Sequence, residues 1–417
     1  MVTFPFIDAH FHPLQLSYFT YGIDLTGVNN EEKLLKKLDE SDNTDNHVLG
    51  FHFVEFPGFL GRDSLNKFSK DIPVVVVRTC LHKLWMNDKA IEVYGRKLSI
   101  NDDGSVIEGD VWIVIDRFFR SLGKSREDLI RNMFLGLLSK GIVGGIEMGI
   151  DVEDGELMSN IADEVGFEYF YFVKSDYDPI SCLGARRCLG VKLFADGSLG
   201  ARTAALIEDY ADSPGEKGVL NWRDEELYAI MKLWHEAGYD ISVHAIGDRA
   251  LSQVLKIYRA LLLEFPRPHR HRVEHLQVMY PGAIEDMKTM AIYASIQPTF
   301  TPEIPWAIER LGKERMAYAY RWRELIENVP TLIGTDAPVY TYEPIDVLNG
   351  LTNDSYWLKF NLEPSSISLG KAIDIYTVTN MHYLGLITDT DLYRVEWSEF
   401  PYKVKKVVSK GRVVYQR

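Results

Sequence analysis

The sequence FIDAHFHP, residues 6–13, decides how the rest of the chain is interpreted. It is an apolar run that ends in His-x-His, a pattern typical of a buried strand. Side chains alternate between the two faces of a strand, so His10 and His12 point the same way and Phe11 points to the other side. Two convergent imidazoles suit zinc, iron, nickel or manganese. Taken alone the signal is weak, because His-x-His also occurs by chance on strand faces.

Composition indicates a soluble globular protein. Of the 417 residues 46% are apolar and 25% are charged, and 46 basic against 60 acidic side chains give a net charge of −14. An acidic surface argues against nucleic-acid binding. No run approaches the roughly 18 apolar residues of a membrane span, and the N-terminus lacks the layout of a secretory signal. We therefore expect a cytoplasmic protein that binds neither nucleic acid nor membrane.

From residue 141 onward, strand and helix patterns alternate. Helical patterns occupy residues 224–237, 250–265 and 303–328. Strands are expected at residues 142–148, 167–173, 189–194, 241–244, 272–275, 292–297 and 331–334. With the opening stretch these make eight strands, which predicts an α/β fold of the (β/α)8 TIM-barrel type. A doubly wound open sheet is the rival fold, but no Gly-x-Gly-x-x-Gly turn follows any of the strands.

Two further segments fall outside the barrel pattern. Residues 13–138 read as a large insertion after the first strand, with a helix at 31–40 and strands at 47–53 and 72–80. The tail holds Val-rich runs around the turn Lys410-Gly411, which predicts a small β appendage. We therefore divide the chain into a barrel over residues 1–385, including the insertion, and an appendage over residues 386–417.

Polar side chains stand at the C-terminal ends of several predicted strands, where barrel enzymes place their sites. They are His10, His12, Lys192, His244, His275 and Asp336. Singly, each has an ordinary explanation, such as a hydrogen-bonded core histidine or a lysine whose amine reaches solvent. Buried without partners, however, each costs on the order of 2 to 7 kcal/mol. A shared metal centre at one barrel mouth compensates all of them.

The order His-x-His, Lys, His, His, Asp resembles the amidohydrolase superfamily. Four longer phrases resemble its YtcJ-like branch, amidohydrolase family three. These are GVKLFADGSLGARTA (190–204), VHAIGDRA (243–250), HRVEHLQ (271–277) and GTDAPV (334–339). The segment RTCLHKLWMNDKA (78–90) also resembles that branch. The resemblance covers residues from about 5 to 385.

The resemblance implies a binuclear centre of divalent metal ions. Its ligands would be His10 and His12 for one ion, His244 and His275 for the other, Lys192 as the bridge, and Asp336 on the first ion. Lys192 would bridge after carboxylation by carbon dioxide, and Glu147 is the fallback bridge. The ions would lower the pKa of a shared water to give hydroxide, with Asp336 as the base. Zinc is the default for an imidazole-rich site, with iron, nickel or manganese as alternatives.

The expected activity is that of a metal-dependent amidohydrolase, which cleaves a non-peptide C–N bond in a small-molecule amide, formamide, cyclic amide or amidine. The alternatives are a binuclear-metal esterase, lactonase or phosphoesterase, and a non-catalytic binding barrel. The resemblance further suggests that the insertion covers the mouth and supplies His82 and Asn87 as substrate contacts. Arg202 either meets an anionic substrate group or braces its own loop. A homodimer is left open.

The sequence departs from the family at its two ends. Members of the branch carry a β-sandwich before the first barrel strand, whereas here that strand begins within ten residues of Met1. Either the protein works with a reduced sandwich built from the tail, or the start codon was placed late. The predicted site depends on neither possibility.

Overall fold

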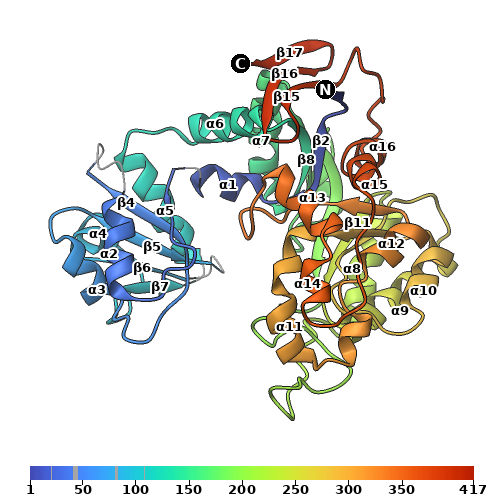
Figure 1. Cartoon of the computed structure of the whole chain (residues 1–417), viewed down its shortest axis with the longest axis horizontal. Helices are drawn as coiled ribbons and strands as arrows, with labels where there is room; N and C mark the ends of the chain where they lie inside the picture. The colour runs from blue at the N-terminus through green and yellow to red at the C-terminus, as the bar shows by residue number, and fades with distance from the viewer. Residues whose placement is uncertain (20, 41–45, 80–82, 108) are drawn as a thin grey trace. The chain divides into compact units, whose positions relative to one another are not determined.

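The computed structural model describes residues 1–19, 21–40, 46–79, 83–107 and 109–417. They form two compact units, one of residues 1–12 and 134–417 and the other of residues 13–133 (Figure 1). Of the residues singled out above, His82 lies outside the described part of the chain.

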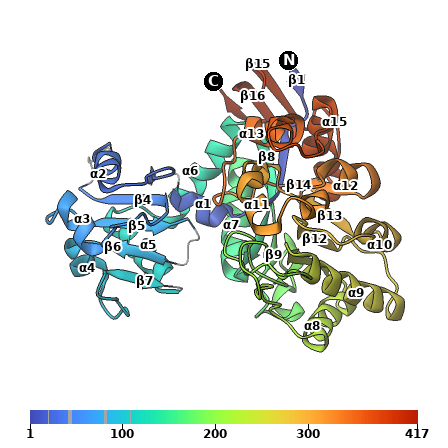
Figure 2. The same ribbon diagram turned by 60° about the horizontal axis from the view of Figure 1, so that its bottom comes forward.

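The larger unit is built on an eight-stranded parallel sheet that curves into a barrel (Figure 2). Its order is β14-β13-β12-β11-β10-β9-β8-β2. The strands are β2 (Phe6–Phe11), β8 (Ile142–Ile150), β9 (Glu168–Val173), β10 (Cys188–Phe194), β11 (Asp240–Ala245), β12 (Arg272–His275), β13 (Tyr293–Ile296) and β14 (Thr331–Ile333). They lie where the apolar runs predicted them, and the (β/α)8 barrel is confirmed.

Helices surround the barrel, and none among the described residues is long and apolar enough to cross a membrane. Those between strands are α7 (Val152–Val165), α8 (Asp224–Glu236), α9 (Asp248–Glu264), α10 (Ala283–Met290), α11 (Ile304–Leu311) and α12 (Trp322–Asn328). After β14 come α13 (Pro344–Thr352), α14 (Ser355–Leu358), α15 (Leu369–Asp374) and α16 (Asn380–Tyr383). The single helix predicted over residues 303–328 is wrong. Helix α11 ends at Gly312, whose φ of 74° suits glycine and stops the helix.

Side chains help to close the barrel between β2 and β14, the two ends of the strand order. The buried amide of Asn380 donates from Nδ2 to the carbonyls of Ile7 at 2.6 Å and Ile333 at 2.8 Å. Its Oδ1 accepts from the backbone N–H of Ile333 at 3.2 Å. The Asn380 side chain thus supplies hydrogen bonds between the first strand and the last.

A second link joins the C-terminal ends of the same two strands. Buried Asp8 accepts hydrogen bonds from the backbone N–H groups of His10 at 3.1 Å and Thr335 at 3.0 Å, and from the Thr335 hydroxyl at 2.6 Å. Next to it, the N–H of Asp336 donates to the carbonyl of His10 at 2.7 Å. Gly334 permits this approach, because a Cβ there would lie 2.4 Å from the His10 backbone. Together with those of Asn380, these hydrogen bonds form a seam between β2 and β14, and the seam places His10 beside Asp336.

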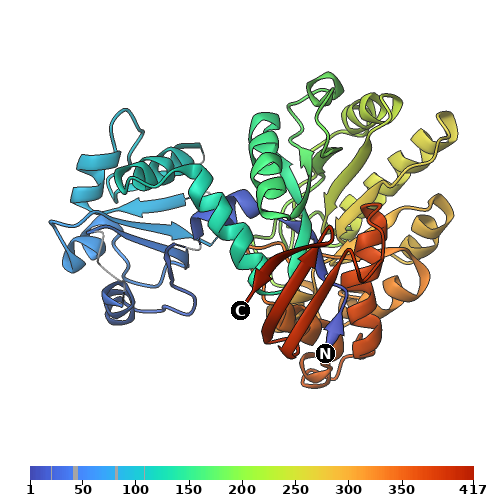
Figure 3. The same ribbon diagram turned by 90° about the horizontal axis from the view of Figure 1, so that it is seen from above.

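The predicted β appendage is present as an antiparallel sheet of order β1-β15-β16-β17. Its strands are β1 (Val2–Thr3), β15 (Arg394–Glu399), β16 (Lys403–Ser409) and β17 (Arg412–Gln416). Lys410 and Gly411 form the expected turn between β16 and β17, with φ of 53° and 72°. Strand β1 was not predicted, and it brings both chain ends to this sheet (Figure 3).

The smaller unit, the insertion, is a five-stranded sheet with an apolar core on each face. In sheet order, its strands are β3 (Ile23–Asp24), β4 (Val48–Phe53), β5 (Val74–Arg78), β6 (Lys83–Met86) and β7 (Ser105–Ile107). One core contains side chains of α1 (Pro13–Phe19), α4 (Asp88–Tyr94) and α5 (Gly109–Ser121), and the other contains those of α2 (Glu31–Asp39) and α3 (Arg62–Phe68). Helix α6 (Arg126–Ser139) leads back to the barrel.

We predict that Asn380→Ala lowers the free energy of unfolding of the barrel by about 2 to 4 kcal/mol, because it leaves buried backbone groups of Ile7 and Ile333 without partners. Urea unfolding of the two proteins measures the difference. Asn328→Ala, at the exposed end of α12, is the matched control and should change stability by no more than about 0.5 kcal/mol. Equal effects of the two substitutions would contradict the role of the seam.

Candidate metal centre

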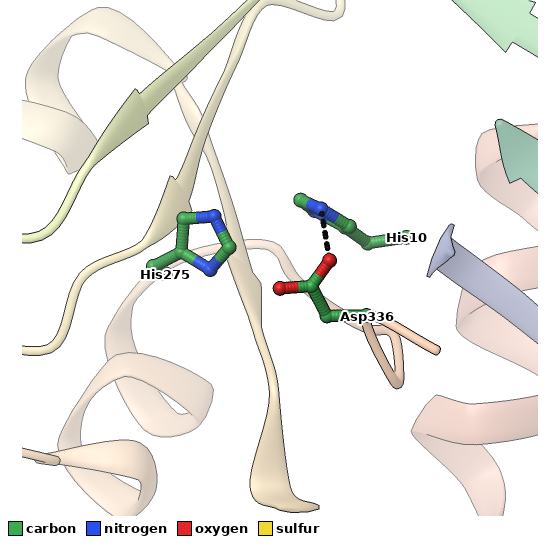
Figure 4. A group of neighbouring side chains, drawn as sticks. All are labelled: His10, His275 and Asp336. Atoms are coloured by element: carbon green, nitrogen blue, oxygen red, sulfur yellow. Dashed lines mark ion pairs between the residues drawn. The ribbon is translucent and has the colours of Figure 1, made fainter. Parts of the chain in front are cut away.

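Three buried side chains from distant parts of the sequence converge at the C-terminal end of the barrel. His10 comes from β2, His275 from β12 and Asp336 from the segment after β14 (Figure 4). One ligand atom from each lies within 4.8 Å of those of the other two. Two imidazoles and a carboxylate at this spacing form a donor set for a divalent cation.

Hydrogen bonds aim both imidazoles at the common point. His10 Nδ1 lies 2.6 Å from Oε2 of Glu274, and its Nε2 lies 3.3 Å from Oδ1 of Asp336. His275 Nδ1 lies 2.8 Å from Oε1 of Gln297. Both partners accept, so each Nδ1 carries the hydrogen and each Nε2 keeps its lone pair. The lone pair on Nε2 of each ring is thereby available to bind a metal ion.

Glu274 is held ionised by a buried arginine. Burial opposes ionisation, but the charge of Arg272 lowers the pKa of Glu274 well below its usual range. Arg272 donates to both carboxylate oxygens, and Ser242 Oγ donates to Oε1 at 2.6 Å. Arg272 also donates to the carbonyl of Ala9 at 2.7 Å, directly before His10 in the chain. This network fixes the ring that β2 delivers.

Two of the three convergent residues have a strained backbone. His275 has a φ of 73° and Asp336 a φ of 59°, both in the left-handed region that non-glycine residues avoid. Such conformations cost on the order of 1 to 3 kcal/mol each and cluster at functional sites. The positive φ sets the direction of the His275 and Asp336 side chains, and no pattern in the sequence predicts this conformation.

His12 and His244 flank the three residues. His12 Nε2 lies 3.1 Å from Oδ1 of Asp336, and its Nδ1 lies 3.4 Å from Oε1 of Glu147. Burial opposes protonation, but hydrogen bonds to Asp336 and Glu147 raise the pKa of His12 to about 9. The ring of His244 lies 4.5 Å from that of His275, with its Nε2 2.9 Å from the Gly197 carbonyl. The carboxylates thus create a negative potential that suits a cation.

Lys192, two residues before the end of β10, has a buried amine. The residue is 1% exposed, and its Nζ has no hydrogen-bond partner among the described residues. It lies 5.2 Å from the centre of the Phe194 ring. Burial lowers the pKa of Lys192 to about 8, against the charges of Glu274 and Asp336. An unpartnered, buried amine facing these charges is the observation that a bound cation and a modified lysine would explain.

Two of the three predicted substrate contacts, Asn87 and Arg202, lie among the described residues. Asn87 is buried at the start of α4, where its amide donates to the carbonyls of Ser69 and Ile72 and its Oδ1 accepts from Val74 and Ala90. All of its hydrogen-bonding capacity is used inside the insertion. Arg202 is paired with Asp212 at 2.8 Å, which favours a loop brace.

The side chains that orient the imidazoles, Glu274 and Gln297, are not among the site residues predicted from the sequence. A signal was present in Arg272-Val273-Glu274. Two opposite charges spaced by two residues on one face of an apolar strand predict a buried ion pair beside whatever follows that strand.

The barrel and its converged donors define a metal-dependent hydrolase. The Amidohydrolase family model matches residues 1–390, and the chain belongs to this family. YtcJ of Bacillus subtilis (strain 168) is 26% identical to it, over all of this chain and 89% of the relative. Protein LONG AFTER FAR-RED 3 of Arabidopsis thaliana is 24% identical, over 81% of this chain and 66% of the relative.

Solved structures agree with this assignment. An uncharacterized metal-dependent hydrolase from Pyrococcus horikoshii OT3 superposes with a TM-score of 0.75 at 26% identity, over 92% of this chain and 81% of the other. A second, from Pyrococcus furiosus, gives 0.72 at 25% identity, over 92% and 82%. The metal-dependent hydrolase class and divalent metal use are therefore supported by family, neighbours and donor set alike.

We predict that Glu274→Gln weakens divalent-metal affinity by about 10- to 100-fold, because the neutral amide no longer fixes the tautomer of His10. It also leaves the Arg272 charge uncompensated, at about 3 to 5 kcal/mol of stability. Chelator competition and urea unfolding measure the two effects. Ser242→Ala, which removes one hydrogen bond to the same carboxylate, is the control and should cost about 1 kcal/mol. Unchanged metal affinity in Glu274→Gln would contradict the orienting role.

Proposed function

We propose that the protein hydrolyses a non-peptide C–N bond of a small molecule, in an amide, formamide, cyclic amide or amidine. The supporting observation is the convergence of His10, His275 and Asp336 within 4.8 Å, with Lys192 Nζ buried and unpartnered nearby. His12 and His244 complete the proposed ligand set on either side. Family membership supports hydrolysis, and the choice of a C–N bond is ours.

The proposed site has separate roles for its residues. A divalent cation, when bound, lowers the pKa of water and polarises a carbonyl. His10 and His275 would hold the cation through Nε2 lone pairs, since Glu274 and Gln297 orient the two rings. Asp336 Oδ1, within 3.3 Å of two imidazole nitrogens, takes the proton of the attacking water and returns it to the departing nitrogen. The new C–O bond forms when the water attacks the substrate carbon, and the C–N bond breaks when the departing nitrogen receives the proton.

Lys192 is proposed as the bridging ligand after carboxylation. Carboxylation requires the neutral amine, which burial favours at this position. The nitrogen attacks carbon dioxide, a C–N bond forms, and one proton leaves to solvent. The product is an anionic carbamate with two oxygen donors. Glu147, 3.4 Å from His12 Nδ1, is the alternative bridge.

We predict that protein loaded with zinc in bicarbonate carries an added mass equal to one carbon dioxide, located on Lys192. Intact mass under gentle conditions checks this, because carbamates revert in acid. Lys192→Gln should show no adduct. An unmodified wild-type mass under the same conditions, with zinc bound, would favour Glu147 as the bridge.

We predict that Asp336→Asn keeps the fold and lowers the rate of hydrolysis by about 100- to 10,000-fold, because the amide cannot accept the proton. A panel of N-acyl, N-formyl and cyclic amides, with matched esters, identifies a working substrate. Circular dichroism checks the fold. Asp176→Asn, at an exposed position of the same unit, should retain full activity. Hydrolysis of the esters alone would contradict the C–N assignment, and full activity in Asp336→Asn would contradict the role of the base.

A further inference from the structure

Glu303 is a buried carboxylate that the proposed reaction does not use. It ends the short helix Pro298–Glu303 that follows β13, on the same end of the barrel as the candidate metal centre. The residue is 8% exposed. Among the described residues it makes no ion pair with any lysine, arginine or histidine. Buried carboxylates are ordinarily paired with a cation.

Three neutral groups hold this carboxylate. Gln277 Nε2 donates to Oε2 at 3.0 Å, and the Tyr320 hydroxyl donates to the same oxygen at 3.1 Å. The Tyr340 hydroxyl donates to Oε1. A carboxylate offers about four acceptor positions, so one position remains, and it is on Oε1.

Without a paired cation, the ionised carboxylate of Glu303 costs free energy in this buried position. Burial raises the pKa of Glu303 to about 7 against the opposing hydrogen bonds, and the charge of Asp336 adds to the rise. A brace between loops that is built from neutral donors alone leaves the negative charge of a buried carboxylate uncompensated. The acid is therefore better explained by a positive group that arrives with a ligand.

The surroundings of Glu303 are continuous with the candidate metal centre. Gln277 lies two residues after His275, and Tyr340 lies four residues after Asp336. The Phe300 ring stacks on the His275 imidazole, with 5.9 Å between centroids and 5° between planes. Phe300 also packs against Tyr340 at 4.8 Å. Contacts thus run from His275 through Phe300 and Tyr340 to Glu303, and aromatic faces favour cations.

We propose that Glu303, with the rings of Phe300 and Tyr340, binds a primary ammonium group of the substrate at the end remote from the bond that is cleaved. One open acceptor position suits a single N–H donor of an ammonium. A guanidinium or amidinium fork needs an open position on each oxygen, and both positions on Oε2 are taken. The inference names the substrate class and rests on the proposed function only for the bond that breaks.

The kinetic test compares matched substrates that differ in one charge. Mono-N-acetyl and mono-N-formyl diaminoalkanes are set against N-acyl alkylamines of equal chain length, with metal-loaded enzyme. We expect the charged member to be preferred by at least about tenfold in kcat/KM, equivalent to about 1.4 kcal/mol. Glu303→Gln should bring the ratio close to one, mainly through KM. Glu309→Gln, an exposed glutamate on α11, is the control and should keep the wild-type preference.

A structural brace and a binding group give different results. Loss of a brace lowers turnover of charged and neutral substrates together, whereas loss of the binding group lowers it for the charged member alone. A ratio that Glu303→Gln leaves unchanged overturns the proposal, as does the absence of any preference in the wild-type enzyme.

A binding measurement separates this inference from the proposed function and needs no variant. Titration calorimetry on metal-loaded wild-type protein compares n-hexylammonium, n-hexylguanidinium and n-hexanol. We expect the ammonium to bind at least about tenfold more tightly than the other two probes. Equal affinities overturn the inference even if C–N hydrolysis is found. Selective ammonium binding supports it even if no amide is hydrolysed, in which case only the proposed function fails.

Discussion

The site depends on the hydrogen bonds that help to close the barrel between its first and last strands. Asn380 bridges the backbones of Ile7 and Ile333, and Asp8 ties the end of β2 to Thr335. Without this closure, His10 on β2 and Asp336 after β14 would not meet, since those strands are the two ends of the strand order. With it, His10 and Asp336 lie 3.3 Å apart between side-chain atoms. The spacing of His10 and Asp336 in the candidate metal centre is thus a consequence of the closure of the barrel.

Hydrogen-bonded neighbours hold two of the candidate ligands in strained backbone conformations. His275 and Asp336 hold unfavourable backbone conformations, and the surrounding hydrogen bonds keep them there. Glu274 accepts hydrogen bonds from both Arg272 and the ring of His10. The buried ion pair of the barrel interior therefore contacts the candidate site directly. The same end of the barrel carries a second, neutral cradle around Glu303. Glu274, on β12, is paired with the cation of Arg272, whereas Glu303, in the helix that follows the neighbouring strand β13, is held by neutral groups.

Much of the fold follows from local pattern, because each barrel strand is a short apolar run between polar breaks. The convergence of His10, His275 and Asp336 was predictable for the same reason, since strand ends in a parallel barrel share one face. The side-chain directions were not. The orientation of His10 depends on Glu274, 264 residues away, and the turn of Asp336 depends on a positive φ that no sequence pattern encodes. The end of α11 at Leu311 was also missed, because the helical periodicity continues across Gly312. Strand β1 is too short to show any period at all.

The position of Asn380 has a consequence for the way the molecule is made. Its amide contacts Ile7, 373 residues earlier in the chain, so the seam cannot close until nearly the whole polypeptide has left the ribosome. Pairings over such separations form slowly, because a long loop must be ordered before they are gained. Strand β8, which pairs with one edge of β2, is synthesised well before β14 and Asn380, which lie at the other edge of β2. A chaperone that shields that edge during translation would act at the step on which the candidate metal centre depends.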